Sequence, residues 1–328
     1  MALTTIGTAG EAAVQGSVAR ALRGHRADVR GRVFEGVLVL CLLVSLAVLG
    51  LLIHRVVADG LGVYTDRGVD FLDGGLSSQA DRAGIAQGII GSFWIAVGVV
   101  VLAIPVGVGA AVYLEEYAPR NRLTSFIELN IRNLAGVPSV VYGLLGLAVF
   151  VETLDGFSGA SGVQRRTLAA AALTLAVLVL PIVIITTSEA IRAVPQALRE
   201  GAYGVGATRW DVIRSQVLPY AAPGILTGSL LSIARAVGEA APLIVVGAAT
   251  GLLGRNPGLS LGSVADPGSL TERFTALPVL VSTWTKLPAE EFRVDNAAAT
   301  ILAMLAFVLV VNAIAIVLRN RFEQKRSA

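Results

Sequence analysis

The chain has 328 residues, of which 55% are hydrophobic and only 15% charged, and its mean hydropathy is +0.74. Soluble globular domains carry about 25% charged residues, so this composition indicates a protein embedded in a lipid bilayer. The single cysteine, Cys41, excludes a disulfide framework, and two histidines are too few for a multi-histidine metal site. A net charge of +3 is too small and too dispersed for a protein that binds nucleic acid.

Long apolar runs divide the chain into segments that can cross a bilayer. A helix needs about 20 apolar residues to span the hydrocarbon core. We therefore predict an all-α integral membrane protein with about six transmembrane helices. In chain order these are Val33–Ile53, a stretch within Ile85–Leu114, Asn133–Val151, Thr167–Ser188, about Pro219–Leu253, and Asn296–Leu318.

Lysine and arginine are distributed unevenly between the two sides of these spans. The segments on the side of both termini carry 16 of the 26, the opposite segments carry 9, and Arg235 lies within a span. Basic residues accumulate in cytoplasmic loops, so we expect both termini in the cytoplasm. The expected parts are a basic tail (1–32) near membrane lipid, a first span with an acidic extracytoplasmic loop (33–84), a core (85–320) with a cytoplasmic loop (189–218), and a tail (321–328).

Two outside segments have distinctive compositions. The first loop carries five aspartates among glycines, and we interpret it as a solvated acidic loop because the spacing matches no calcium-binding motif. The last outside segment, 251–296, contains the apolar run Phe274–Trp284, which is too short to span. We expect this run to pack at the membrane interface, with Trp284 at the level of the headgroups.

The segment Glu189–Pro219 is too polar to cross the membrane and lies on the cytoplasmic side. Pro195 is expected to break it into two short helical pieces, and Gly201, Gly204 and Gly206 allow a tight turn before Ala207–Val217. A protruding helix–glycine–helix element suits docking into a cleft of a partner protein. A surface loop lying on the membrane is the alternative that composition leaves open.

This segment resembles the EAA loop of ABC importer permeases. That motif reads Glu-Ala-Ala, three residues, Gly, nine residues, Ile, one residue, Leu-Pro. Here Glu200 and Ala202 fit, Gly206 and Leu218-Pro219 follow at the right spacing, and Gly201 and Gln216 depart from the motif. The strings YLEEYAP (113–119), NLAGVPSVVYGLLGL (133–147), REGAYGVGATRW (199–210) and RAVGEAAPL (235–243) are similar to the phosphate-specific (Pst) permease, most of all its A-type subunit. Ala240 stands where that family has threonine.

The resemblance covers about residues 85–320 and implies a type I ABC importer permease fold and a complex. Such a permease pairs with a homologous second permease, rests on two ATP-binding subunits, and receives phosphate from an extracytoplasmic binding protein. ATP and Mg would be bound by the ATPase, with no cofactor on this chain, which itself lacks a phosphate-binding P-loop motif and is expected not to be an enzyme. The loop 199–214 would couple the ATPase to the spans through Glu200, Gly201, Ala202, Gly206, Ala207, Thr208, Arg209 and Trp210.

A charged pair interrupts the fifth span. Arg235 lies about 24 Å along a helix that begins near Pro219, which places it near the middle of the bilayer. Such a residue normally faces a cavity or a partner. Glu239 is four residues further along and would share its face in a continuous helix. We interpret the pair as part of the substrate pathway, because a guanidinium can replace two of the hydrogen bonds that a dianion loses with its water shell.

Other readings of these residues stay open. Arg235 and Glu239 could simply neutralise each other and bridge to the second permease. Asn133, Ser139 and Tyr142 on the third span are secondary pathway candidates, and each could instead only bond to a neighbouring helix. Pro105, Pro181 and Pro223 are expected to mark kinks in the helices.

Other functions are alternatives to a permease that imports phosphate. The nearer alternatives are the sister permease subunit, or a permease for another oxyanion such as sulfate or molybdate. A proton-coupled carrier with a titrating Glu239 is disfavoured by the small size and by the absence of inverted halves. An intramembrane enzyme would need a nucleophile–base pair or a metal cluster within the spans, and the residue types present do not supply one.

Overall fold

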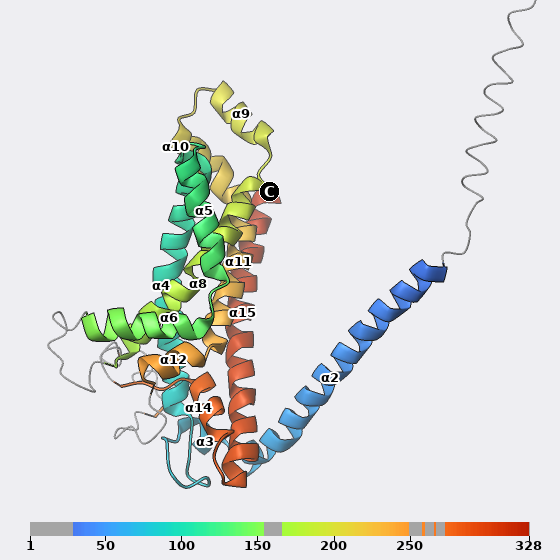
Figure 1. The fold of residues 1–328 in the computed structure, drawn as a ribbon, viewed down its shortest axis with the longest axis vertical. Coiled ribbons are helices and arrows are strands. Elements are labelled where there is room, and N and C mark those ends of the chain that lie inside the picture. Colours follow the sequence, from blue (N-terminus) through green and yellow to red (C-terminus); the bar gives the residue numbers. More distant parts are fainter. Residues whose placement is uncertain (1–28, 154–165, 249–257, 260–265, 267–272, 328) are drawn as a thin grey trace, which may run out of the picture. The chain divides into compact units, whose positions relative to one another are not determined.

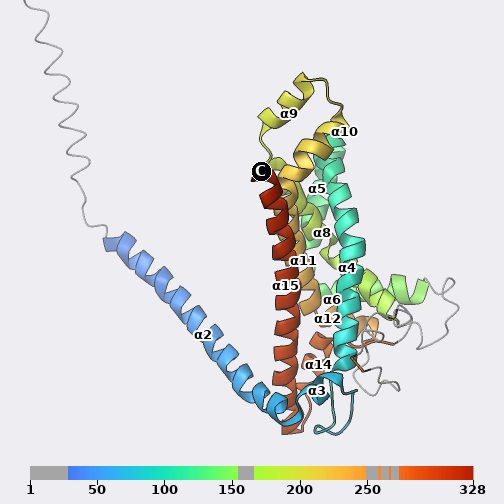
Figure 2. The same cartoon turned by 180° about the vertical axis from the view of Figure 1, so that it is seen from behind.

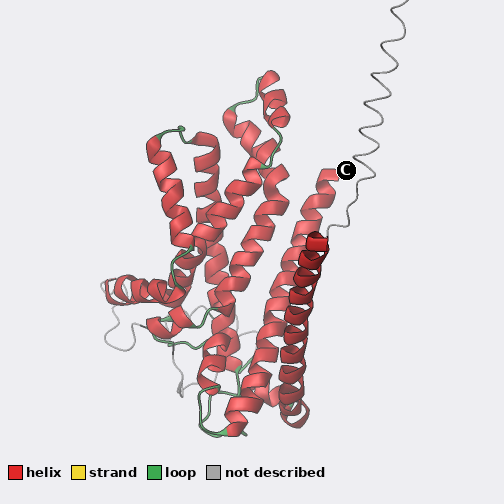
Figure 3. Cartoon of the chain, turned by 45° about the vertical axis from the view of Figure 1, so that its right-hand side comes forward, coloured by secondary structure: helices red, strands yellow, loops and turns green. Residues whose placement is uncertain are grey.

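The computed structural model describes residues 29–153, 166–248, 258–259, 266 and 273–327. Most of the described residues are in helices, as Figure 3 shows, and they form no strand beyond an isolated antiparallel bridge between Thr167 and Arg273. The all-α class predicted from the sequence is confirmed. The chain divides into two parts, residues 1–55 and 56–328, and each is described by itself.

The first long helix, α2 (Val29–Arg67), belongs to both parts in sequence and contains the expected first span. It continues through residues 54–67, which we predicted to lie in the outside loop, and that boundary was wrong. The reason is packing: the hydroxyl of Tyr64 donates a hydrogen bond of 2.7 Å to the carbonyl of Ala299, on helix α15 (Ala297–Ser327). Val63 is buried beside it, so contact with α15 extends the helix beyond its apolar run.

Four long helices form the bundle of the second part. Helix α8 (Leu168–Arg192) is the central one, and two thirds of its most apolar stretch is buried. It packs against α4 (Ala86–Val112) and against α11 (Leu218–Gly238), and α11 packs on α15 (Figures 1 and 2). Apolar side chains of α4, α8 and α11 make the main core between them.

Small residues allow these helices to approach closely. A Cβ atom added to Gly107 of α4 would lie 2.6 Å from Cγ1 of Val183 on α8, which is far inside van der Waals contact. Lipid offers no hydrophobic force between helices, so close contact at small residues supplies much of their attraction. The expected prolines, Pro105, Pro181 and Pro223, all lie inside these helices.

The third predicted span is not one helix. Helix α5 (Arg122–Ala135) and the helix formed by α6 (Ser139–Gly146) with η2 (Leu147–Thr153) meet at an angle of 101°. The break falls at Gly136-Val137-Pro138, because Pro138 lacks an N–H and disfavours a helical residue before it. Figure 1 shows α6 lying across the direction of the bundle. We expected an uninterrupted helix over Asn133–Val151, and that expectation was wrong.

The fifth predicted span is also interrupted. Helix α11 ends at Gly238, and the short helix α12 (Ala241–Val246) follows after two residues. Pro242 causes the interruption, since its ring would clash with the carbonyl of Gly238 in a continuous helix. A proline is tolerated in the first turn of a new helix, which is where Pro242 lies in α12. Residues 249–253, the rest of the expected span, lie outside the described residues.

One end of the bundle carries an aromatic cluster. Three short helices meet there: α3 (Val69–Asp73), α14 (Leu277–Trp284) and η6 (Glu291–Asn296). Trp284 is only 4% exposed, and its ring centroid lies 5.6 Å from that of Phe292 and 6.5 Å from that of Phe71. Trp284 therefore packs inside the protein, and its expected level at the headgroups stays a prediction.

The opposite end carries the predicted loop. Helix α4 runs into the π-helical segment η1 (Tyr113–Tyr117), and the loop is built from α9 (Gln196–Gly204), α10 (Arg209–Val212) and η4 (Ile213–Val217). Figures 1 and 2 place the C-terminal end of α15 at this same end. Five described helices are long and apolar enough to span a membrane, or up to six if the bent pair α5–α6 is one span, and the expected number of about six lies within this range.

Candidate substrate pathway and coupling site

The charged pair lies where α11 ends. Arg235 is in the last turn of α11, where a cation interacts favourably with the helix dipole. Its Nε lies 3.4 Å from Oε1 of Glu239, and the two side chains are 42% and 21% exposed. Glu239 has an extended backbone, with φ −85° and ψ 112°. We expected it to share a helical face with Arg235, and that expectation was wrong. The pair is nevertheless formed across the end of the helix.

Tyr142 joins the broken third span to this region. It is 6% exposed, and its hydroxyl donates a hydrogen bond of 2.9 Å to the carbonyl of Leu134, across the break between α5 and α6. Its side chain packs in the same core as Ile233 and Ala236 of α11, and Ala236 is the residue next to Arg235 in that helix. The bent span therefore brings Tyr142 close to the charged pair, while the hydroxyl itself is used to hold the bend.

The other two pathway candidates lie at the same break. Ser139 is the first residue of α6 and is half-buried, and Asn133 is exposed near the end of α5. The carbonyl of Asn133 accepts a hydrogen bond from Gly136. Among the described residues, neither side chain is hydrogen-bonded to Arg235. The structure thus pairs Arg235 with Glu239, packs Tyr142 against the same helix as Arg235, and places Asn133 and Ser139 at the break beside Tyr142.

The loop has the helix–turn–helix form that the sequence predicted. Gly206 has φ +85°, a left-handed conformation that glycine adopts without steric cost, and it makes the turn between α9 and α10. Gly201 and Gly204, expected in the turn, lie within α9 instead. Thr208 begins α10 with a capping box: its hydroxyl accepts from the N–H of Asp211, and its own N–H donates to that carboxylate.

The surface of this loop exposes large apolar side chains. Trp210 is 53% exposed, Tyr203 46% and Val205 86%, and Glu200 and Gly201 are also exposed. Exposed apolar groups gathered on a protruding element are typical of a surface that contacts another protein or a membrane. Tyr203 and Val205 were missed from the sequence because they fall in the variable positions of the motif. Their position next to the turn at Gly206 was the feature of the sequence that could have indicated their exposure.

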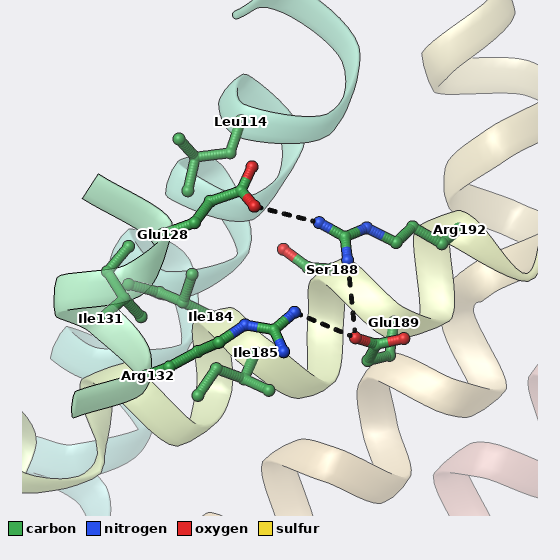
Figure 4. A pocket seen from close by; sticks show the side chains of 9 residues that line it. All are labelled: Leu114, Glu128, Ile131, Arg132, Ile184, Ile185, Ser188, Glu189 and Arg192. Carbon is green, nitrogen blue, oxygen red and sulfur yellow. Dashed lines mark ion pairs between the residues drawn. The ribbon is translucent and has the colours of Figure 1, made fainter. Parts of the chain in front are cut away.

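Ion pairs that the sequence analysis missed surround a small depression between α5 and α8 (Figure 4). Arg192 lies 3.5 Å from Glu128 and 3.7 Å from Glu189, and Glu189 also lies 3.7 Å from Arg132. The depression is lined by apolar as well as charged side chains. Its charges are largely paired with one another, so the site acts as a structural joint between the two helices.

The residues described show no group of three or more His, Cys, Asp or Glu side chains placed to hold a metal ion. The expectation that this chain binds neither metal nor nucleotide stays a prediction.

Comparison with known proteins identifies the family. Residues 103–328 match the family described as binding-protein-dependent transport system inner membrane component. The probable ABC transporter permease protein YqgI of Bacillus subtilis (strain 168) is 33% identical over 216 residues, which cover 66% of this chain and 70% of the relative. Phosphate transport system permease protein PstA of Yersinia pestis is 33% identical over 232 residues, 71% of each chain. PstA of Mycobacterium leprae (strain TN) is 39% identical over 174 residues, 52% of this chain and about half (54%) of that relative.

A solved structure supports the fold independently. An inward-facing structure of the MetNI methionine ABC transporter aligns with a TM-score of 0.55 at 15% identity and covers 73% of this chain and 95% of that chain. The fold is therefore that of a type I ABC importer permease, as the resemblance implied, and the relatives confirm the resemblance to PstA-type permeases. The chain belongs to the family of binding-protein-dependent transport system inner membrane components.

Proposed function

We propose that this chain is a transmembrane permease subunit of an ATP-driven importer of inorganic phosphate and forms half of the translocation pathway. The single observation that carries the substrate is the similarity to phosphate transport permeases over most of the bundle. Its relatives are permease subunits, which are not themselves catalytic. We therefore assign ATP hydrolysis, with its ATP and Mg, to a partner chain.

Arg235 is the proposed phosphate contact in the pathway. A half-exposed guanidinium at a helix end can donate two hydrogen bonds to one phosphate and compensate for lost water. Glu239 would hold Arg235 between passages and keep the empty site close to neutral. Tyr142, Ser139 and Asn133 are proposed to line the pathway around the bend of the third span.

The proposed complex has four kinds of protein subunit. A homologous second permease would complete the pathway, two ATP-binding subunits would dock on the loop 199–214, and an extracytoplasmic protein would deliver phosphate. The exposed side chains of Tyr203, Val205 and Trp210, together with those of Glu200 and Arg209, support the docking role, while Ala202 and Ala207 on the same loop are half-buried. The loop and the C-terminal end of α15 lie at one end of the bundle, which supports the cytoplasmic placement of both (Figure 1).

Uptake of labelled phosphate at low external concentration tests this function. Cells that lack the chain are compared with complemented cells, with and without collapse of the proton gradient while ATP is maintained. We expect uptake that depends on the chain and survives the collapse. Uptake that vanishes with the gradient would support a proton-coupled carrier, in which Glu239 titrates. No dependence on the chain, with redundant transporters deleted, would direct the search to sulfate and molybdate.

A further inference from the structure

Three consecutive residues of η1, the segment that continues α4, each contact an arginine of a different element. Glu115 pairs with Arg192 at the end of α8, and Glu116 pairs with Arg199 of α9. The guanidinium of Arg209, the first residue of α10, lies 5.0 Å from the ring centroid of Tyr117. We call these six residues the arginine clasp. Consecutive residues of a helix point in different directions, so η1 can hold three elements at once.

The two ion pairs of the clasp are well formed. Arg192 contacts both carboxylate oxygens of Glu115, with Nε–Oε2 at 2.9 Å and Nη2–Oε1 at 2.8 Å. The first contact is a hydrogen bond and the second is a close contact between opposite charges, so together they fix the distance between the two side chains. Arg199 donates to Oε1 of Glu116 at 2.9 Å, and these two side chains are only 15% and 9% exposed. Because these two side chains are largely buried, water and salt screen the attraction between their charges only weakly.

Arg199 also binds the end of α8. Its Nη1 donates to the carbonyl of Val194 at 2.7 Å, and its Nη2 donates to the carbonyl of Ile191 at 3.0 Å. The last carbonyls of a helix lack partners within it, and a cation near them is favourable. One guanidinium therefore joins α9, the end of α8 and η1.

The two arms of the loop are attached in different ways. In α10 and η4, Val212, Ile213 and Val217 are fully buried, so the core holds this arm. No residue of α9 is buried, and Arg199 is one of its two half-buried side chains. Ala202 packs against the core at this end, and Arg199 supplies the polar contacts that hold α9 to the end of α8 and to η1.

We propose that the arginine clasp transmits movement of the docking loop to α4, with Arg199 as the positioning residue. Because α4 continues directly into η1, a displacement of α9 or α10 acts on the end of a transmembrane helix. This inference rests on the proposed function, in which a partner ATPase moves the loop. It goes further by naming the helix that receives the movement and the side chains that deliver it.

The first test measures phosphate moved per ATP hydrolysed by the purified complex in proteoliposomes. Arg199→Gln is expected to lower this ratio about tenfold, within the usual range for coupling between sites, while the complex assembles and still hydrolyses ATP. Arg199→Lys keeps the charge but cannot bind Glu116 and both carbonyls together, so it should recover part of the ratio. Exposed Arg120→Gln makes the same charge change outside the clasp and should leave the ratio unchanged.

A second readout does not depend on the substrate. Val106 of α4 is 57% exposed, so a Val106→Cys variant in a Cys41→Ser background can carry an environment-sensitive fluorophore. ATP should change its fluorescence in the complex with an intact clasp, and the change should be lost with Arg199→Gln or Glu116→Gln. An equal change in intact and altered complexes, or none in the intact complex, would overturn the clasp. Failure of the intact complex to move phosphate would overturn the proposed substrate instead, and the fluorescence would still judge the clasp.

Discussion

At the scale of single residues, the charged pair depends on the way α11 ends. The interruption at Pro242 leaves Glu239 with an extended backbone, and its side chain turns back to Arg235 at 3.4 Å. The pair is partly exposed within the second part of the chain, so neither charge carries the full cost of burial in a low-dielectric interior. An arginine held in this way can exchange its carboxylate partner for a passing anion.

Replacing Arg235 by glutamine should strongly reduce phosphate uptake at low external concentration while the complex still assembles. The loss of a hydrogen bond to a charged group costs about 1.5–3 kcal/mol, or roughly ten- to a hundredfold in binding. Arg235→Lys is the matched variant: it keeps the charge but loses the fork of donors, so intermediate uptake is expected. Labelled-phosphate uptake and co-purification of the subunits are the measurements. Normal uptake by Arg235→Gln would remove this residue from the pathway.

At the scale of elements, packing between helices rests on small residues. Gly107 faces Val183 across the contact of α4 with α8, whereas Gly109, two residues away on α4, has no atom within 4 Å of an added Cβ. The same helix therefore offers one glycine that packing requires and one that it does not.

The substitutions Gly107→Ala and Gly109→Ala should differ in sign. Overpacking at Gly107 should lower the free energy of unfolding by about 1–3 kcal/mol. Alanine at Gly109 should be neutral or stabilising, because alanine favours a helix by up to about 1 kcal/mol over glycine. Thermal unfolding of the detergent-solubilised protein measures both. Equal effects of the two substitutions would contradict the close contact of α4 with α8.

The turn of the docking loop makes a second element-scale prediction. A β-branched residue at Gly206 meets a steric cost of about 1–2 kcal/mol at φ +85°. Gly206→Val should therefore displace α9 from α10 and detach or uncouple the ATPase. Gly204→Ala is the control, since this glycine lies in α9 with open space around it. Co-purification of the ATPase and its stimulation by substrate are measured, and full coupling of Gly206→Val would exclude a docking role for the turn.

At the scale of the whole molecule, the two ends of the bundle differ in chemistry. One end presents the exposed loop with Tyr203, Val205 and Trp210, and the other encloses Trp284 among aromatic rings and half-buried turns. In the proposed orientation, the first end faces the cytoplasmic ATPase and the second faces the binding protein.

Single cysteines can test this orientation. Val205→Cys should react with a membrane-impermeant maleimide only in inside-out vesicles, and Ala289→Cys, exposed at the other end, only in intact cells or right-side-out vesicles. Both variants are made in a Cys41→Ser background, because Cys41 is the only native cysteine. The reverse pattern of labelling would invert the assigned topology.

The sequence by itself determined the membrane class, the family resemblance and the form of the docking loop. These features depend on composition, on the length of apolar runs and on local turn chemistry, which neighbouring residues in the chain specify. The predicted break at Pro195 and the role of Gly206 belong to this group, since both arise from the backbone of one or two residues.

Only the tertiary structure decided where the third and fifth spans break, how far α2 extends, and which arginines pair with which carboxylates. A hydropathy pattern records how apolar a segment is and does not record its direction. The helices α5 and α6, which meet at 101°, together pass the same test of hydropathy as one long helix. The pairs of Glu115 with Arg192 and of Glu116 with Arg199 join residues 77 and 83 positions apart. Such contacts depend on the packing of α4, α8 and α9 against one another, which no local pattern in the chain specifies.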